Sequence, residues 1–182
     1  TGALVVDGGT IKLDGNYPTG TSNVALGDTA LDSLTSGNEN TAIGAASLTA
    51  NTSGCYNVSV GRSSLAANTT ACGNTAVGMF SVATNTTGAS NVGIGRNSLR
   101  ANTTASNNTA VGTDSLCANT TGNANVAIGC GVLDANTTGS ENIGIGRSTL
   151  GANTTAGQNT AMGSGVLSAN TTGCRNTGIG YN

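Results

Sequence analysis

The chain has 182 residues, of which 8% are charged and 2% aromatic, and its formal net charge is −2. It contains no His and no Trp. Without clustered Lys and Arg it is unsuited to binding nucleic acid, and no apolar run is long enough to insert into a membrane. Hydrophobic residues make up 36% and recur at fixed places, which disfavours disorder. Any core must be thin and aliphatic.

Residues 1–22 precede the repeats described below. The stretch ALVVDGGTIKLDGNYPTG predicts two short strands, Ala3–Val6 and Thr10–Leu13, around a Gly8-Gly9 turn. We expect residues 1–22 to cap the first repeat, because an exposed end of a stack of strands invites edge-to-edge pairing. The sequence stops inside a repeat at Asn182, so we expect a segment of a longer fibre.

From residue 23 to residue 182 the chain repeats every 17 residues, without insertion or deletion. Each repeat opens with Asn, which we number position 1, and residues at one position in all repeats form a column. The opening residues are Asn23, Asn40, Asn57, Asn74, Asn91, Asn108, Asn125, Asn142, Asn159 and Asn176. A short fixed period is typical of stacked structural units, here ten, the last truncated.

The column types predict an all-β fold. Position 5 is always Gly, position 4 is always aliphatic or Met, and position 3 is always Ala, Gly or Ser. Seventeen residues are too few for a helical hairpin, and the Asn-Thr-Thr-Gly run breaks helices. We therefore predict a parallel β-solenoid with one repeat per coil, a rise of about 4.8 Å per coil and a total length of about 48 Å.

We expect positions 4 and 9 to point inward and to form two aliphatic ladders. The predicted core residues are Ile43, Val60, Val77, Ile94, Val111, Ile128, Ile145, Met162, Leu48, Leu65, Leu99, Leu116, Leu133, Leu150 and Leu167. Position 2 takes both Val and Thr, which indicates a half-buried column at a contact between chains. Gly at position 5 suits a corner with positive φ or close backbone approach.

Asn at positions 1 and 12 can bond turn backbone and the next Asn above it. The predicted Asn ladder comprises Asn40, Asn57, Asn74, Asn91, Asn108, Asn125, Asn142 and Asn159. Ten Asn-x-Ser/Thr sequons occur, and this structural role accounts for most of them without glycosylation.

We find no pattern for catalysis, for a cofactor or for a metal. There is no His, and the carboxylates occupy variable columns. Gly-x-Gly phrases belong to the repeat and precede no predicted helix, and calcium-binding β-rolls need Asp where this chain has Thr and Asn. Arg62, Arg96 and Arg147 share position 6, as a sparse basic stripe for acidic glycans or simply as solubilising charge. We expect no enzyme.

The chain has five Cys and no Cys-x-x-Cys pair, so neither a zinc site nor a closed disulfide framework is indicated. Cys55 and Cys72 share position 16 in neighbouring repeats, about 5 Å apart in a stack. They are a candidate disulfide, with free thiols as the alternative.

The phrases Asn-Thr-Ala-Val-Gly at 74–78 and Asn-Thr-Thr-Gly at 85–88 carry a family resemblance. They resemble the 17-residue repeats of phage and viral tail-fibre proteins. They also resemble the Asn-x-Val-Ala-Ile-Gly repeats in the YadA-like heads of trimeric autotransporter adhesins, from which this chain departs in its longer, strictly constant coil. The resemblance covers residues 23–182 and implies a left-handed parallel β-roll, a side-by-side homotrimer and attachment to a cell surface. No anchor or chaperone domain is recognisable here.

Three functions follow as alternatives. The first is a structural segment of a virion tail fibre that projects a tip, with a host-surface glycan or protein bound by the tip or the variable columns. The second is a bacterial surface adhesin or a self-assembled extracellular filament. The third is an ice-binding solenoid, because the Thr residues of position 13 form a regular hydroxyl array.

Overall fold

The computed structural model describes residues 20–181, whose regular secondary structure is all β-strand. Each coil contributes one strand of three residues. The strands are β1 (Val24–Leu26), β2 (Thr41–Ile43), β3 (Val58–Val60), β4 (Thr75–Val77), β5 (Val92–Ile94), β6 (Thr109–Val111), β7 (Val126–Ile128), β8 (Ile143–Ile145), β9 (Thr160–Met162) and β10 (Thr177–Ile179). Of the predicted cap, residues 1–19 lie outside the described residues.

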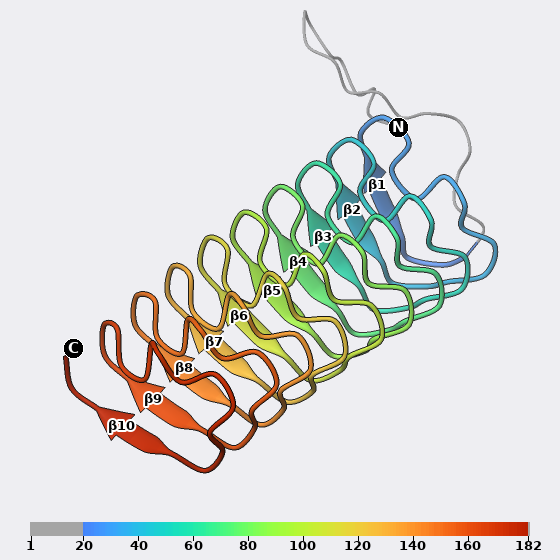
Figure 1. Cartoon of the computed structure of the whole chain (residues 1–182). Helices are drawn as coiled ribbons and strands as arrows, with labels where there is room; N and C mark the ends of the chain where they lie inside the picture. The colour runs from blue at the N-terminus through green and yellow to red at the C-terminus, as the bar shows by residue number, and fades with distance from the viewer. Residues whose placement is uncertain (1–19, 182) are drawn as a thin grey trace, which may run out of the picture.

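The ten strands form one parallel sheet in chain order, from β1 to β10. Every pairing joins residues 17 apart, as in Val92 with Thr109. Figure 1 shows the coils stacked along one axis, with the strands aligned on one side and two turned segments completing each coil. The predicted β-solenoid with one 17-residue repeat per coil is confirmed.

Turns of unusual backbone conformation close each coil. The Gly residues of column 5 have φ between 121° and 141°, and the non-Gly residues of positions 7, 9 and 17 have φ between 45° and 63°. Left-handed conformation costs an L-residue about 1–2 kcal/mol. At position 9 this cost falls on fully buried Leu side chains such as Leu99, whose burial contributes about 2 kcal/mol each. Burial therefore offsets the strain of the corner.

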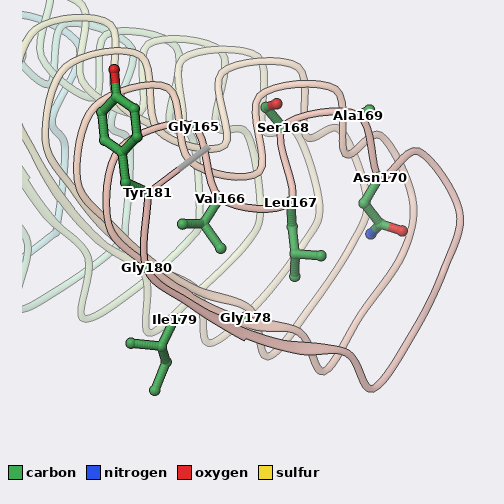
Figure 2. Close-up of a pocket in the computed structure, with 10 residues that line it drawn as sticks. All are labelled: Gly165, Val166, Leu167, Ser168, Ala169, Asn170, Gly178, Ile179, Gly180 and Tyr181. Atoms are coloured by element: carbon green, nitrogen blue, oxygen red, sulfur yellow. The ribbon is translucent and has the colours of Figure 1, made fainter.

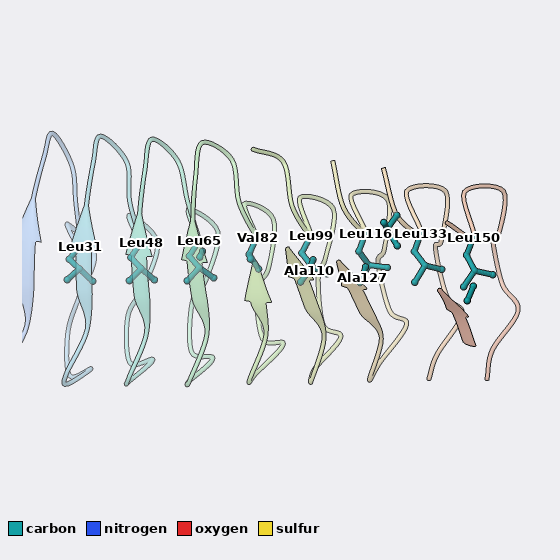
Figure 3. Close-up of a cluster of buried hydrophobic side chains, with 14 of the residues drawn as sticks. Leu31, Leu48, Leu65, Val82, Leu99, Ala110, Leu116, Ala127, Leu133 and Leu150 are labelled. Carbon is teal, nitrogen blue, oxygen red and sulfur yellow. The ribbon is translucent and has the colours of Figure 1, made fainter. Parts of the chain in front are cut away.

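The core lies between the sheet and the segment around position 9. Figure 3 shows the Leu residues of column 9 in a single row, with Ala110 and Ala127 of column 3 opposite them. Leu48, Leu99 and Leu150 have no exposed surface. The prediction that column 9 points inward is confirmed, although Leu167 in the last complete coil is only half-buried.

The prediction that column 4 points inward is wrong. Ile43, Ile94, Ile128 and Met162 are 37–41% exposed, and Val60, Val77, Val111 and Ile145 are half-buried. Column 3 is the inward one, as in Ala76 and Ala110, which are completely buried. The physical reason is the narrowness of the coil, because Leu of column 9 leaves room beneath it for only a small side chain.

The narrowness shows where column 3 carries Gly. A Cβ at Gly93 would lie 2.5 Å from Val82 Cγ2, and one at Gly144 would lie 2.6 Å from Val132 Cγ1. One at Gly178 would lie 2.7 Å from Cγ1 of Val166. In each case the preceding coil has Val at position 8 or 9 in place of the usual Ser or Leu. The chain thus compensates a larger side chain on one wall with a smaller one on the other.

This compensation predicts a coupled pair. We expect Gly144→Ala to lower the free energy of unfolding by about 2 kcal/mol, because its Cβ overpacks against Val132. Val132→Ser restores the residue found at Ser115, whose hydroxyl donates to the carbonyl of Ala127 at 2.9 Å. The double variant should recover at least about 1 kcal/mol relative to the sum of the single changes, measured by denaturant unfolding. If the losses in unfolding free energy of the two single variants simply added up in the double variant, the compensation between Gly144 and Val132 would be contradicted.

Candidate interaction surface

The outer side of the sheet is a continuous apolar surface made by columns 2 and 4, which we call the apolar sheet face. Its members in the central coils are Thr75, Val77, Val92, Ile94, Thr109, Val111, Val126 and Ile128. Strand residues alternate between faces, so the small inward residue of column 3 forces both of its neighbours outward. Figure 2 shows this in the last coil, where Ile179 points away from the interior into which Val166 and Leu167 project.

No residue of columns 2 or 4 is charged along the whole repeat. Val58, Ile94 and Ile143 are 38–39% exposed, although large aliphatic side chains are normally covered. Ten strands at about 4.8 Å and three residues at about 3.3 Å make a strip of roughly 500 Å². The largest apolar patch of a typical monomer is about 300–600 Å² and is often functional, so this strip is a candidate interaction surface.

Hydrogen-bonded Asn side chains line one edge of this face. The Asn108 backbone N–H donates to Asn91 Oδ1 at 3.0 Å, and Asn108 Nδ2 donates to the carbonyl of Gly122 at 2.9 Å. Column 12 forms a second ladder, in which Asn102 Nδ2 donates to Asn85 Oδ1 at 2.8 Å. Among the described residues no buried side-chain nitrogen or oxygen lacks a partner. The predicted Asn ladders are confirmed, and they hold the strand ends at one spacing.

The other edge follows column 5, where successive Gly backbones nearly touch. A Cβ at Gly95 would lie 2.6 Å from the carbonyl oxygen of Gly112. One edge is therefore held by Asn side-chain hydrogen bonds and the other by close backbone contact, so the face between them is preorganised.

The Thr residues of column 13 are engaged within the solenoid. Thr103 Oγ1 donates to the carbonyl of Thr120 at 3.1 Å, and Thr120 Oγ1 donates to that of Thr137 at 3.0 Å. These side chains are half-buried, whereas Thr104 and Thr121 of column 14 are exposed. The hydroxyl array behind the ice-binding hypothesis thus serves to join coils.

The basic stripe of column 6 is broken up by local contacts. Arg96 pairs with Asp114 at 3.1 Å, with both side chains well exposed, and the Arg62 guanidinium lies 5.5 Å from the centre of the Phe80 ring. An exposed pair of this kind contributes little to stability. The stripe is therefore not a continuous basic surface.

Cys55 and Cys72 are both free, so the candidate disulfide is not formed. Each thiol instead accepts a hydrogen bond from the coil before it: Asn38 N donates to Cys55 Sγ at 3.4 Å and Cys55 N to Cys72 Sγ at 3.1 Å. Ser106 plays the same part for Ala89 N, at 3.0 Å. Most residues of column 16 have a side chain that can accept a hydrogen bond, and Ala89 and Gly157 are the exceptions.

Cys117 and Asp134 lie together at position 10 of neighbouring coils, where the Cys117 thiol donates to the Asp134 carbonyl at 3.5 Å. Burial raises the pKa of the Asp134 carboxyl, and burial followed by the charges of Asp134 and Asp114 raises the pKa of the Cys117 thiol. A raised pKa disfavours the reactive thiolate. No cluster of three or more His, Cys, Asp or Glu suited to a metal occurs in the described part of the chain.

Among the described residues, two hollows could in principle hold a ligand. One, of about 520 Å³, is the open end of the last described coil, where Val166, Leu167 and Tyr181 surround it in Figure 2. The other, of about 480 Å³, is a shallow polar hollow that includes Glu141, Gln158 and Arg175. The second hollow also includes Ser140 and Cys174. The Cys174 thiol donates to the carbonyl of Thr172, and the Glu141 carboxylate accepts a hydrogen bond from Gln158. The described residues include no helix able to span a bilayer.

The apolar sheet face is the strongest candidate site. The sequence predicted a contact between chains at column 2 but did not predict that column 4 also faces outward. The available signal was column 3, which takes only Ala, Gly and Ser and therefore lies on the inner side of the strand. Comparisons of the chain with family models, with curated proteins and with solved structures found no match.

Proposed function

We propose that the chain is a stiff segment of an adhesive fibre, in which three copies associate side by side through the apolar sheet face. The observation that supports this is the uncharged face of columns 2 and 4 along ten coils. The setting that suits it best is the tail fibre of a phage or other virus, where the segment holds a receptor-binding tip away from the virion.

The small interior of the coil favours association of several chains. The hydrophobic interior consists mainly of the Leu residues of column 9 and of the small residues and Val of columns 3 and 8, and the rest of the interior is filled by buried Asn, so one chain buries little apolar surface. Packing about 500 Å² of apolar surface per copy would contribute on the order of 10 kcal/mol before the costs of association. Around a threefold axis, each face meets the faces of two other copies.

The sequence resemblance to tail fibres and to trimeric adhesin heads supports the same assembly. A bacterial surface adhesin or an extracellular filament would use the same face in the same way. The sequence that adjoins the repeats in the full-length protein distinguishes these settings: a tip or chaperone domain indicates a tail fibre, and a membrane-anchor barrel indicates an adhesin.

Two lysines on the face test the association. Light scattering should give a trimeric mass for the unchanged chain and a monomeric mass for the variant Ile94→Lys, Ile128→Lys, because each buried ammonium would lack a partner. Both side chains are 39% exposed in the single chain, so the far-UV circular dichroism should not change. The matched control, Thr104→Lys with Thr121→Lys, lies on the exposed column 14 and should remain trimeric. A monomeric mass for the unchanged chain would contradict the proposal.

A further inference from the structure

The apolar sheet face is bordered by two columns of variable residues. Column 17 precedes the strand of each coil and column 6 follows it, so the two lie six residues apart at the same level of the stack. Arg62, Arg147, Tyr56 and Glu141 of these columns are all exposed. Outside the face itself, these borders are the surfaces nearest to a neighbouring copy.

At three levels of the stack the residues at the two borders are complementary. At the level of β8, column 17 has Glu141 and column 6 has Arg147. At β3 the pair is Tyr56 and Arg62, and at β10 it is Arg175 and Tyr181, so an aromatic ring faces a guanidinium in both. Among residues 20–181 no coil places like charges at both borders.

These pairs are not made within one chain. The strand and its flanking Asn and Gly separate the two borders, and six residues of near-extended backbone span up to about 20 Å. Glu141 Oε2 instead accepts a hydrogen bond from Gln158 Nε2 at 3.0 Å, and the only ion pair among the described residues joins Arg96 to Asp114. Arg62 lies over the Phe80 ring, and Arg175 Nε donates to Gln158 Oε1 at 2.9 Å. Within a single chain these residues therefore contact their neighbours along the stack and not the opposite border.

A threefold axis parallel to the solenoid would bring the borders together. In such a ring every interface is head-to-tail, so column 17 of one copy lies beside column 6 of the next at the same level. An antiparallel twofold pairing would instead bring each column against itself. The complementarity at the levels of β3, β8 and β10 fits the ring.

We propose that Glu141 pairs with Arg147 of the adjacent copy, and that the Tyr–Arg pairs at β3 and β10 are made in the same way. This rests on the proposed trimer and specifies its register. The apolar face repeats every 17 residues, so packing alone scarcely distinguishes aligned chains from chains displaced by one coil. The border residues do not repeat, and a displacement of one coil separates every one of these pairs.

Cysteine cross-linking tests the register. The background replaces all five native Cys by Ser, the residue that columns 6, 10 and 16 already carry at Ser164, Ser168 and Ser140. In this background Glu141→Cys with Arg147→Cys, oxidised by glutathione disulfide, should yield a covalent trimer on a non-reducing gel. The matched control, Glu141→Cys with Arg96→Cys, places the thiols three coils apart and should stay uncross-linked.

The outcomes separate the two proposals. A trimeric mass before oxidation without a covalent trimer after it would overturn the register while leaving the trimer intact. A monomeric mass before oxidation would overturn both proposals. Covalent dimers alone would overturn the ring, because a closed ring joins all three copies, and a cross-linked control would show chains displaced along the axis.

Discussion

Replacing Gly95 by Ala is expected to destabilise the chain by about 4 kcal/mol, a large effect for one methyl group. Gly95 has φ of 129°, a region that L-residues enter at a cost of about 1–3 kcal/mol. Its Cβ would lie 2.6 Å from the oxygen and 2.7 Å from the carbonyl carbon of Gly112, and backbone cannot move aside. Overpacking adds a further 1–3 kcal/mol, roughly. Because equivalent Gly residues stack above and below, the displacement would spread to neighbouring coils.

Gly131→Ala is the matched control for this change. Gly131 has φ of 60°, and the nearest atom to an added Cβ is Asp134 Oδ2 at 3.7 Å. Ala46 already occupies the same position with φ of 56°. The control should therefore cost about 1 kcal/mol, the ordinary penalty of a left-handed Ala. Thermal unfolding followed by circular dichroism compares the two variants, and equal losses would show that column 5 is not held by backbone contact.

The fold could be predicted from the sequence because the 17-residue period alone fixes how each coil stacks on the next. A period of 17 without insertion places each residue over its equivalent, and the pairing of Val92 with Thr109 follows directly. The Asn ladder could be predicted for the same reason, since a polar residue repeated at every coil must find its partners along the axis. Gly95 could be assigned to a corner because only Gly tolerates positive φ together with close backbone approach.

The direction of column 4 could not be predicted from hydrophobicity. Columns 4 and 9 are both aliphatic apart from Met162, so hydrophobicity alone does not show which of the two lies inside. The deciding fact is steric, because Leu99 above the sheet admits only Ala110 or a similarly small residue beneath it. The restriction of column 3 to small residues therefore shows which side of the strand faces the core, whereas the hydrophobicity of Ile94 does not.

The interaction surface follows from this reversal. With column 4 inward, only the mixed Val and Thr residues of column 2 would have been available for chain contact. With column 4 outward, Ile94 and Ile128 add large aliphatic groups to the same strip, so association would bury more apolar surface. The state of Cys55 and Cys72 could not be predicted because it depends on side-chain direction, which spacing alone does not fix.

Asn108→Ala is expected to lower the free energy of unfolding by about 3 kcal/mol. The substitution removes the donor to the carbonyl of Gly122 at 2.9 Å and the acceptor for Asn125 N at 2.9 Å. Asn108 has no exposed surface, so water cannot easily replace either bond. Each buried group left without a partner costs about 1–3 kcal/mol. Denaturant unfolding of the variant and of the unchanged chain measures the loss.

Asn123→Ala separates this effect from the general cost of changing Asn. Asn123 is exposed, accepts a hydrogen bond from Ser106 N at 2.7 Å, and shares its column with Ala89. Water can take the place of its side chain, so the control should lose less than about 1 kcal/mol. If the two variants lost equal stability, the ladder would act only through shape, and polar satisfaction would not explain why every coil opens with Asn. A difference of about 2 kcal/mol, set by burial, would instead explain why position 1 never varies while position 16 changes freely.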